Sequence, residues 1–179
     1  LKIDENSLCT EPLTVFGNLP YNISTEILIK WIMNMDYNKS WFDYLILMFQ
    51  KEVADRIISN FNNKTYGRLS IIANWRLNIK KICDINPHCF YPKPKVDSSL
   101  LLLKPKKNFF NFKSPKNLEK ITRIFFMHRR KKIKTPFLQL FDKDKNLAEK
   151  LGINLDLRPQ NLDFNTYFEL TKEYENLRC

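Results

Sequence analysis

The stretch LTVFGNLPYNIST, residues 13–25, contains the pattern that decides the fold. Its apolar start, residues 13–19, predicts a buried β-strand, and Ser24 can cap a helix over residues 25–35. Between them lies the loop NLPY, residues 18–21. Because α/β sheets bind ligands in the loops outside the carboxyl ends of their strands, we expect the functional site here. The helix repeats its apolar residues on one face: Ile27, Leu28, Trp31, Ile32 and Met35.

Strand and helix patterns alternate along the residues that follow. Residues 44–49 (YLILMF) predict a second buried strand, and residues 51–60 predict a helix with its apolar side chains inward. Residues 69–77 fit both the helical and the strand period, whereas residues 79–85 and 99–103 predict strands. This alternation favours an α/β sheet. The inward residues of the second helix are Val53, Ala54, Ile57 and Ile58.

The last part of the chain has a different composition and only helical patterns. The change comes at KPKKNFFNFKS, residues 104–114, and Ser114 followed by Pro115 is typical of a helix start. We therefore divide the chain into an α/β domain, residues 1–107, and a small all-α domain, residues 108–179. In the helix that starts there, Leu118, Ile121 and Phe125 form an apolar stripe. Further helices are expected over residues 134–141, 147–151 and 164–177, and Gly152 is expected as a helix stop.

Glycine is scarce, and this excludes one class of site. The chain has 3 glycines in 179 residues, and Gly17, Gly67 and Gly152 lie far apart. They cannot form a glycine-rich phosphate loop or a dinucleotide fingerprint.

The charge favours a polyanionic partner. The formal net charge is +11, which indicates nucleic acid first and an anionic membrane surface second. An AT-rich genome, which enriches lysine, is the alternative source of part of this excess. Residues 113–134 contain nine basic residues and one acid, Glu119. On a helix this run would form a positive ridge suited to phosphates, and a solvated lysine face is the alternative.

Cysteine usage and hydropathy predict a protein of a reducing, cytoplasmic compartment without a metal. The 4 cysteines form no C-x-x-C pair, and His88 and His128 complete no metal-ligand spacing. No apolar run approaches the ~18 residues of a membrane span, and there is no secretory signal sequence, so we expect no membrane association.

The NLPY loop suits the binding of a planar exocyclic amine. The side-chain oxygen of Asn18 and a nearby backbone carbonyl can accept hydrogen bonds from the two N–H groups of such an amine. This pulls the amine out of conjugation and exposes its lone pair, so that a methyl group can be transferred in line. Tyr21 offers a π face, and Phe90, on the proline-rich loop 87–95, can clamp a flipped base against it. A strand-ending turn, and for Phe90 a loop anchor, are the alternatives.

Several motifs occur in an order that resembles a known family. The motifs are VFGNLPYNIST (15–25), FQKEVADRI (49–57), YGRLSI (66–71), CFYPKPKVDSS (89–99) and RRKKI (129–133). Together they resemble the small-subunit ribosomal RNA adenine dimethyltransferases of the KsgA type. The resemblance implies the C-terminal part of a Rossmann-like, S-adenosylmethionine-dependent methyltransferase sheet plus a helical domain. It also implies dimethylation at N6 of two adjacent adenines near the 3′ end of that RNA.

The same resemblance implies roles for individual residues. Asn18 would hold the target amine and lie against the cofactor, while Leu19 and Pro20 would lend backbone carbonyls. Tyr21 and Phe90 would sandwich the adenine. The residues expected to contact RNA are Arg129, Arg130 and Lys131, which match a basic helix segment of the family, and Lys51, Arg68 and Lys95.

One departure from the family bears on the cofactor. Family members begin with a stretch that contains a glycine-rich cofactor loop and acidic residues, whereas this sequence starts at Leu1, just after them. We therefore expect a truncated chain without the main S-adenosylmethionine motifs, inactive alone. Its sheet would expose a strand edge, which self-association or a missing N-terminal half would cover.

Other functions remain open at this point. The chain could be a non-catalytic remnant that binds ribosomal RNA or the immature 30S-type subunit. It could also be a mitochondrial transcription-factor-like relative, or an unrelated base or glutamine methyltransferase that shares N-x-P-Y. Salt-sensitive RNA binding without cofactor binding would favour the remnant.

Overall fold

The computed structural model describes residues 11–36, 40–141 and 146–178, which form two compact units. Unit 1 consists of the described residues up to Ile58 together with Arg76–Phe109, and unit 2 consists of Ser59–Trp75 and the described residues from Phe110 onward. The boundary between Phe109 and Phe110 falls within the composition change at residues 104–114. Ser59–Trp75, which we expected in the first domain, belongs to unit 2.

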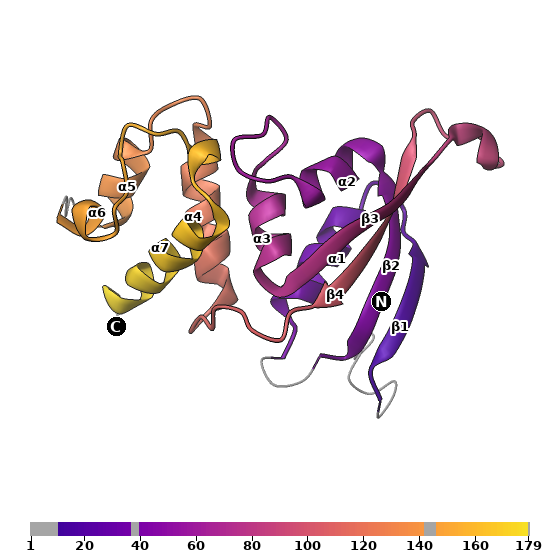
Figure 1. The fold of residues 1–179 in the computed structure, drawn as a ribbon, viewed down its shortest axis with the longest axis horizontal. Helices are drawn as coiled ribbons and strands as arrows, with labels where there is room; N and C mark the ends of the chain where they lie inside the picture. The colour runs from indigo at the N-terminus through magenta and orange to yellow at the C-terminus, as the bar shows by residue number, and fades with distance from the viewer. Residues whose placement is uncertain (1–10, 37–39, 142–145, 179) are drawn as a thin grey trace. The chain divides into compact units, whose positions relative to one another are not determined.

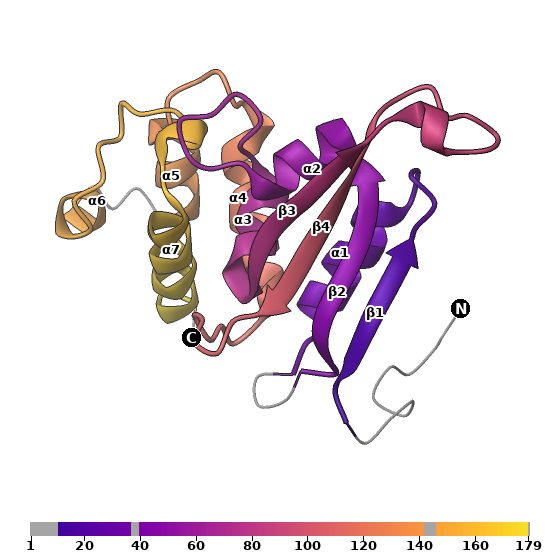
Figure 2. The same cartoon turned by 45° about the vertical axis from the view of Figure 1, so that its right-hand side comes forward.

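Unit 1 contains a mixed four-stranded sheet in the order β1-β2-β4-β3 (Figures 1 and 2). Strands β1 and β2 are parallel, whereas β4 runs antiparallel to both β2 and β3. The expected strands and the α/β class are therefore confirmed. The bounds are β1 Leu13–Asn18, β2 Phe42–Gln50, β3 Leu77–Ile85 and β4 Ser98–Pro105.

The core of unit 1 lies between the sheet and the helices α1 (Ser24–Met33) and α2 (Lys51–Ile58). Strand β2 is interior to the sheet, and its Leu45, Leu47 and Phe49 are fully buried. The predicted helical faces meet this core, because Leu28, Ile32, Ala54 and Ile57 are also buried. This packing fixes the carboxyl ends of β1 and β2, where the candidate site lies.

Two local expectations about the opening stretch are wrong. The strand at residues 13–19 is not buried, because in the described part of the chain β1 pairs only with β2 and Phe16 remains 75% exposed. Ser24 does not cap the helix: it is the first helical residue, Ile23 occupies the cap position, and Ser24 Oγ donates to the carbonyl of Tyr21 at 3.2 Å. Apolar periodicity reports a strand but not its place in the sheet.

The ambiguous residues 69–77 contain both structures in succession. Helix α3 covers Arg68–Arg76, and β3 begins at Leu77. The buried side chain of Arg76 donates to the carbonyls of Ile32 at 3.0 Å and Met35 at 2.6 Å, at the end of α1. These bonds close the last turn of α1 onto the sheet.

Unit 2 is helical, as expected. Its helices after α3 are α4 (Pro115–Met127), α5 (Lys134–Leu140), α6 (Asn146–Lys150) and α7 (Phe164–Asn176). The predicted stripe Leu118, Ile121 and Phe125 is buried, and Phe125 packs edge-on against Tyr167 of α7 with ring centroids 5.7 Å apart. Gly152, the second residue after the end of α6, has φ +63°, which confirms the helix stop.

The N–H groups at the start of α4 find their hydrogen-bond acceptor in a residue far along the chain. Ser114 is the N-cap but makes no side-chain cap bond. Instead the carboxylate of Glu175 accepts from the backbone N–H of Lys113 at 2.9 Å, from that of Ser114 at 3.1 Å, and from Asn117 Nδ2 at 2.7 Å. A buried carboxylate at a helix N-terminus is stabilised by these donors and by the helix dipole.

The described residues hold neither a membrane span nor a metal cluster. None of the helices there has the length and apolar character needed to cross a membrane. The same residues contain no cluster of three or more His, Cys, Asp and Glu side chains that could hold a metal.

Candidate active site and basic surface

A cleft of about 310 Å³ lies at the carboxyl end of β1, within unit 1. Asn18 is the last residue of β1 and is paired with Met48 on β2. The loop of Pro87–Cys89 and the residues after it form the opposite wall. The structure therefore brings the five sequence-predicted residues of the cleft together. The lining residues are Asn18, Leu19, Pro20, Tyr21, Met48, Phe90, Tyr91, Pro92 and Pro94.

Gly17 lets β1 approach β2 closely beside this cleft. A Cβ atom at this position would lie 2.7 Å from Cδ2 of Leu47, a side chain that is fully buried. Such a distance is too short for two carbon atoms, so with a larger residue either the buried side chain of Leu47 or the strand that carries Asn18 would have to shift.

Tyr21 is held in the cleft by a bond to a distant strand. Its hydroxyl lies 2.6 Å from Oγ of Ser98, a fully buried residue at the start of β4. The backbone of the same loop is also fixed, because the N–H of Ile23 donates to the carbonyl of Pro20 at 3.1 Å. That carbonyl retains a second lone pair for an amine.

Phe90 stands on an ordered turn. Pro87–Cys89 forms a short 3-10 helix, in which the side chain of Asn86 accepts from the N–H of His88 at 3.0 Å. The N–H of Phe90 donates to the carbonyl of Pro87 at 3.2 Å. Phe90 is half-buried and lines the cleft. The expected rigid loop is present, although its first residues are helical rather than extended.

A charge network lies on unit 1 around Asp84. Ser99 Oγ donates to Asp84 at 2.6 Å, and the ammonium groups of Lys51 and Lys81 each lie 3.1 Å from the same carboxylate. The Ser99 bond first, and then the two lysines, hold the pKa of Asp84 well below its ordinary value. Bonding to Asp84 in turn raises the pKa of Lys81. Lys51, expected to contact phosphate, is therefore partly neutralised by an ion pair.

The basic residues of unit 2 do not form the expected helical ridge. Helix α4 ends at Met127, and residues 128–132, here called the basic turn, follow it. The N–H of Lys131 donates to the carbonyl of His128 at 2.8 Å, which closes the turn. Like charges three or four residues apart repel on a helix, and a continued helix would place Arg129 beside Lys132 and Arg130 beside Lys134, which favours ending the helix at this point.

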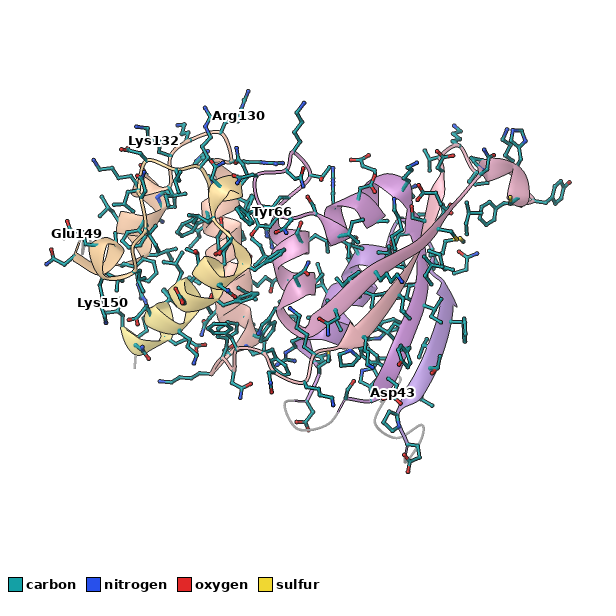
Figure 3. The ribbon with its side chains drawn as sticks, viewed as in Figure 1. Asp43, Tyr66, Arg130, Lys132, Glu149 and Lys150 are labelled. Atoms are coloured by element: carbon teal, nitrogen blue, oxygen red, sulfur yellow. The ribbon has the colours of Figure 1, made fainter. Side chains whose placement is uncertain are left out.

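The members of the basic turn differ in what they contact. The guanidinium of Arg129 donates to the backbone carbonyls of Asn63, at 3.4 Å, and of Lys64. It therefore fixes the loop that precedes α3 in unit 2. Arg130 and Lys131 are exposed, and Figure 3 shows the side chains of Arg130 and Lys132 pointing away from the ribbon. Lys132 pairs with Asp156 at 2.8 Å and thereby lowers the pKa of that carboxyl.

The two remaining candidates for RNA contact lie on different units. Arg68, on unit 2, is 3.8 Å from Glu119, and Lys95 is exposed on the loop of unit 1 that carries Phe90. Sequence reasoning missed Ser98, although it stands in the motif CFYPKPKVDSS, and it missed Met48, which only the strand register places beside Asn18.

Comparison with known proteins agrees with these features. The model of the family described as ribosomal RNA adenine dimethylase matches residues 2–176. The chain belongs to this family. A protein of Pelagibacter ubique named ribosomal RNA small subunit methyltransferase A is 66% identical over 178 residues, covering 99% of this chain and 68% of that protein. One of the same name from Ehrlichia chaffeensis is 39% identical and covers 96% and 64%.

Solved structures support the fold of this dimethylase family. A dimethyladenosine transferase from Plasmodium falciparum has a TM-score of 0.78 at 25% identity, covering 97% of this chain and 70% of that one. The 23S rRNA methyltransferase ErmE has a TM-score of 0.64 at 17% identity, covering 94% and 67%, and shows the fold alone. The chain spans about two thirds of the length of the curated relatives.

Proposed function

We propose that this chain binds the acceptor base in the dimethylation of adenine N6, at two adjacent adenines of small-subunit ribosomal RNA. The observation that carries the proposal is the cleft, in which the loop of Asn18 and the loop of Phe90 meet. Membership of the dimethylase family and relatives named for the small subunit support this substrate. Since the named relatives include bacterial proteins, we place the activity on the assembling 30S-type subunit in the cytoplasm.

The chemistry of the cleft follows from its lining. Asn18 Oδ1 accepts one N–H of the target amine, and a carbonyl of Leu19 or Pro20 accepts the other. The rings of Tyr21 and Phe90 hold the base between them. None of the described residues that line the cleft carries a carboxylate or an imidazole. This composition suits methyl transfer to an amine, because the ammonium product is acidic and releases its proton without a strong base.

S-adenosylmethionine, as methyl donor, fits these residues only in part. Asn18, which lines the cleft, would contact the donor, and the donor would supply the methyl group. The cleft lacks a carboxylate for ribose hydroxyls among its described lining residues, and the chain's 3 glycines are too far apart for a cradle. We therefore propose that the chain alone does not transfer methyl groups and that a further polypeptide segment, or a second copy, completes the donor site. The unpaired edge of β1, as far as the described residues extend, and the 75% exposed Phe16 support this partner surface.

The experiment is a titration calorimetry measurement of S-adenosylmethionine binding, paired with methyl transfer to unmethylated small subunits. We expect no micromolar donor binding and no transfer by the chain alone, with RNA binding that depends on the target base. Donor binding with methyl transfer by the chain alone would overturn the proposal that another segment or copy completes the donor site. In that case Asn18→Ala should abolish transfer. RNA binding that ignores the target base would overturn the acceptor role.

A second candidate is a non-catalytic module that docks on ribosomal RNA. The exposed cations of the basic turn favour it, because Arg130 and Lys131 extend into solvent, where they can reach phosphates. Base-independent binding with a steep salt dependence would support this candidate over the first. The bacterial relatives are named for ribosomal RNA methylation, which favours RNA over the DNA of a transcription factor.

A further inference from the structure

The loop between β3 and β4 exposes an aromatic ring beside the cleft. The side chain of Tyr91 is 102% exposed, although the preceding residue, Phe90, lines the cleft and is half-buried. In Figures 1 and 2 this loop extends beyond the ends of its two strands. A single exposed aromatic side chain is common on a protein surface, so it is the position of Tyr91 beside the cleft that makes it a candidate contact site.

The loop is ordered, so the exposure of Tyr91 is built into the fold. The pair Ile85 and Ser98 closes the hairpin at its base. The turn at Asn86 fixes one side of the loop, and the N–H of Lys51 donates to the carbonyl of Asp97 at 2.9 Å on the other. Three prolines restrict the backbone between them: Pro87, Pro92 and Pro94. A ring that is held outward in this way loses little conformational entropy when a ligand stacks on it.

The backbone directs the two neighbouring aromatic rings to different sides. Phe90 has φ −122° and ψ 147°, an extended conformation in which successive side chains point in opposite directions. Both residues border the cleft, but Phe90 is half-buried there, whereas the side chain of Tyr91 is 102% exposed and presents its ring to solvent. Two adjacent nucleotides of an unstacked strand can turn their bases in different directions. The cleft can take one base while the outer ring takes its neighbour.

Positive groups accompany this outer ring. Nζ of Lys93 lies 3.1 Å from Nε2 of His88, and both side chains are exposed, as is Lys95. An ammonium group that gives one N–H to a neutral imidazole keeps two N–H groups for a phosphate. Aromatic faces combined with cations that follow the backbone are the common means of binding single-stranded nucleic acid.

We propose that Tyr91 is a second stacking site, which holds the nucleobase adjacent to the target base, and that Lys93 contacts the phosphate between them. The inference rests on the proposed function, because the target base defines its neighbour. It assigns the substrate as a strand with two consecutive splayed bases. The ring face selects for a base but not for its identity.

The test measures equilibrium binding of short single-stranded RNAs by fluorescence anisotropy. The RNAs carry two adjacent adenines, with an abasic site at the target, at the neighbour, or at neither. We expect Tyr91→Ala to weaken binding of the intact RNA by roughly 5- to 100-fold, the range of one stacked base. Removing the neighbouring base should weaken the wild-type chain equally, and combining the two changes should add no further loss. Tyr91→Phe should bind like the wild type.

A matched variant on the same loop separates stacking on the ring from a general loss of apolar surface. Val96→Ala removes exposed apolar surface from this loop without a ring and should leave affinity unchanged. Tyr91→Ala binding within twofold of wild type, or losing as much against the RNA that already lacks the neighbouring base, would overturn the proposal. In a further outcome, the RNA without the target base binds as well as the intact RNA while removal of the neighbouring base still weakens binding. That result would overturn the proposed binding of the target base in the cleft and would support the stacking site at Tyr91. Unchanged circular dichroism would show that the variant chains are folded.

Discussion

The cleft of unit 1 and the basic turn of unit 2 are built in opposite ways. In the cleft, Tyr21 is fixed by a bond to the buried Ser98, and most of the other lining residues are apolar. In the basic turn, Arg130 and Lys131 extend into solvent, and Lys132 takes part in an exposed ion pair. Fixed apolar walls select a ligand by shape, whereas mobile charges on long side chains attract any phosphate. The comparison therefore separates recognition of the base from attraction of the strand, and each can be tested alone.

The largest effect should come from removing both walls of the cleft. Tyr21→Ala combined with Phe90→Ala should weaken binding of the target base roughly 100-fold, since each ring contributes one stacking face. An RNA with 2-aminopurine at the target position measures this directly, because stacking quenches its fluorescence. The slope of affinity against salt should stay unchanged. Quenching that survives the double substitution would mean that the base binds elsewhere.

A smaller and different effect is expected at the basic turn. Arg130→Ala combined with Lys131→Ala should weaken RNA binding about tenfold at low salt and reduce the salt slope by roughly 1.4, because each cation neutralises one phosphate. Quenching at saturating RNA should not change. Lys150→Ala, an exposed lysine on α6, is the matched control and should leave the slope as it is. A loss of quenching in the turn variant would mean that the basic turn also contributes to binding of the target base.

The sequence predicted the cleft better than the basic turn, for a physical reason. Asn18 and Tyr21 lie in one short loop at a strand end, so local pattern and the strand-end rule were sufficient to place them. Phe90 could be added because prolines around it restrict the loop. The turn was predicted as a helical ridge because charge composition says nothing about where a helix ends. Arg129 binds backbone carbonyls of Asn63 and Lys64, a contact between segments far apart in sequence.

In the sheet, too, the features that the sequence did not predict depend on contacts between residues far apart in the chain. The bond from Tyr21 to Ser98 joins residues 77 positions apart. The apolar pattern of β1 was correct for a strand but could not report that its outer edge is unpaired in the described residues. Such features depend on which strands become neighbours, and this is a property of the whole topology.

A still smaller effect should follow from loosening one wall. Ser98→Ala removes the partner of Tyr21 while both rings remain, and we expect a three- to fivefold loss of target-base affinity, or about 1 kcal/mol. Tyr21→Phe removes the same hydrogen bond from the other side. The two substitutions together should therefore cost no more than either alone, as measured in a double-mutant cycle. Ser99→Ala, next in the chain, is the control. Additive losses would show that Ser98 acts on the fold rather than on the ring.

The smallest effect distinguishes two carboxylates, one in each unit. The pKa of Asp84 is lowered first by the hydroxyl of Ser99, whereas the pKa of Asp156 is lowered first by the ammonium of Lys132. Because both pKa values are lowered by folding, each group stabilises the fold above its ordinary pKa and loses that contribution as the pH falls through its folded value. Salt screens an exposed charge pair but not a bond from a neutral hydroxyl. Carboxyl carbon NMR titrations should therefore show that 0.5 M salt raises the pKa of Asp156 more than that of Asp84. Ser99→Ala should raise only the pKa of Asp84. Equal salt shifts at the two residues would mean that the pKa of Asp84, like that of Asp156, is lowered mainly by lysine. The contrast between the hydrogen-bonded cleft of unit 1 and the charged surface of unit 2 would then not extend to these two carboxyl groups.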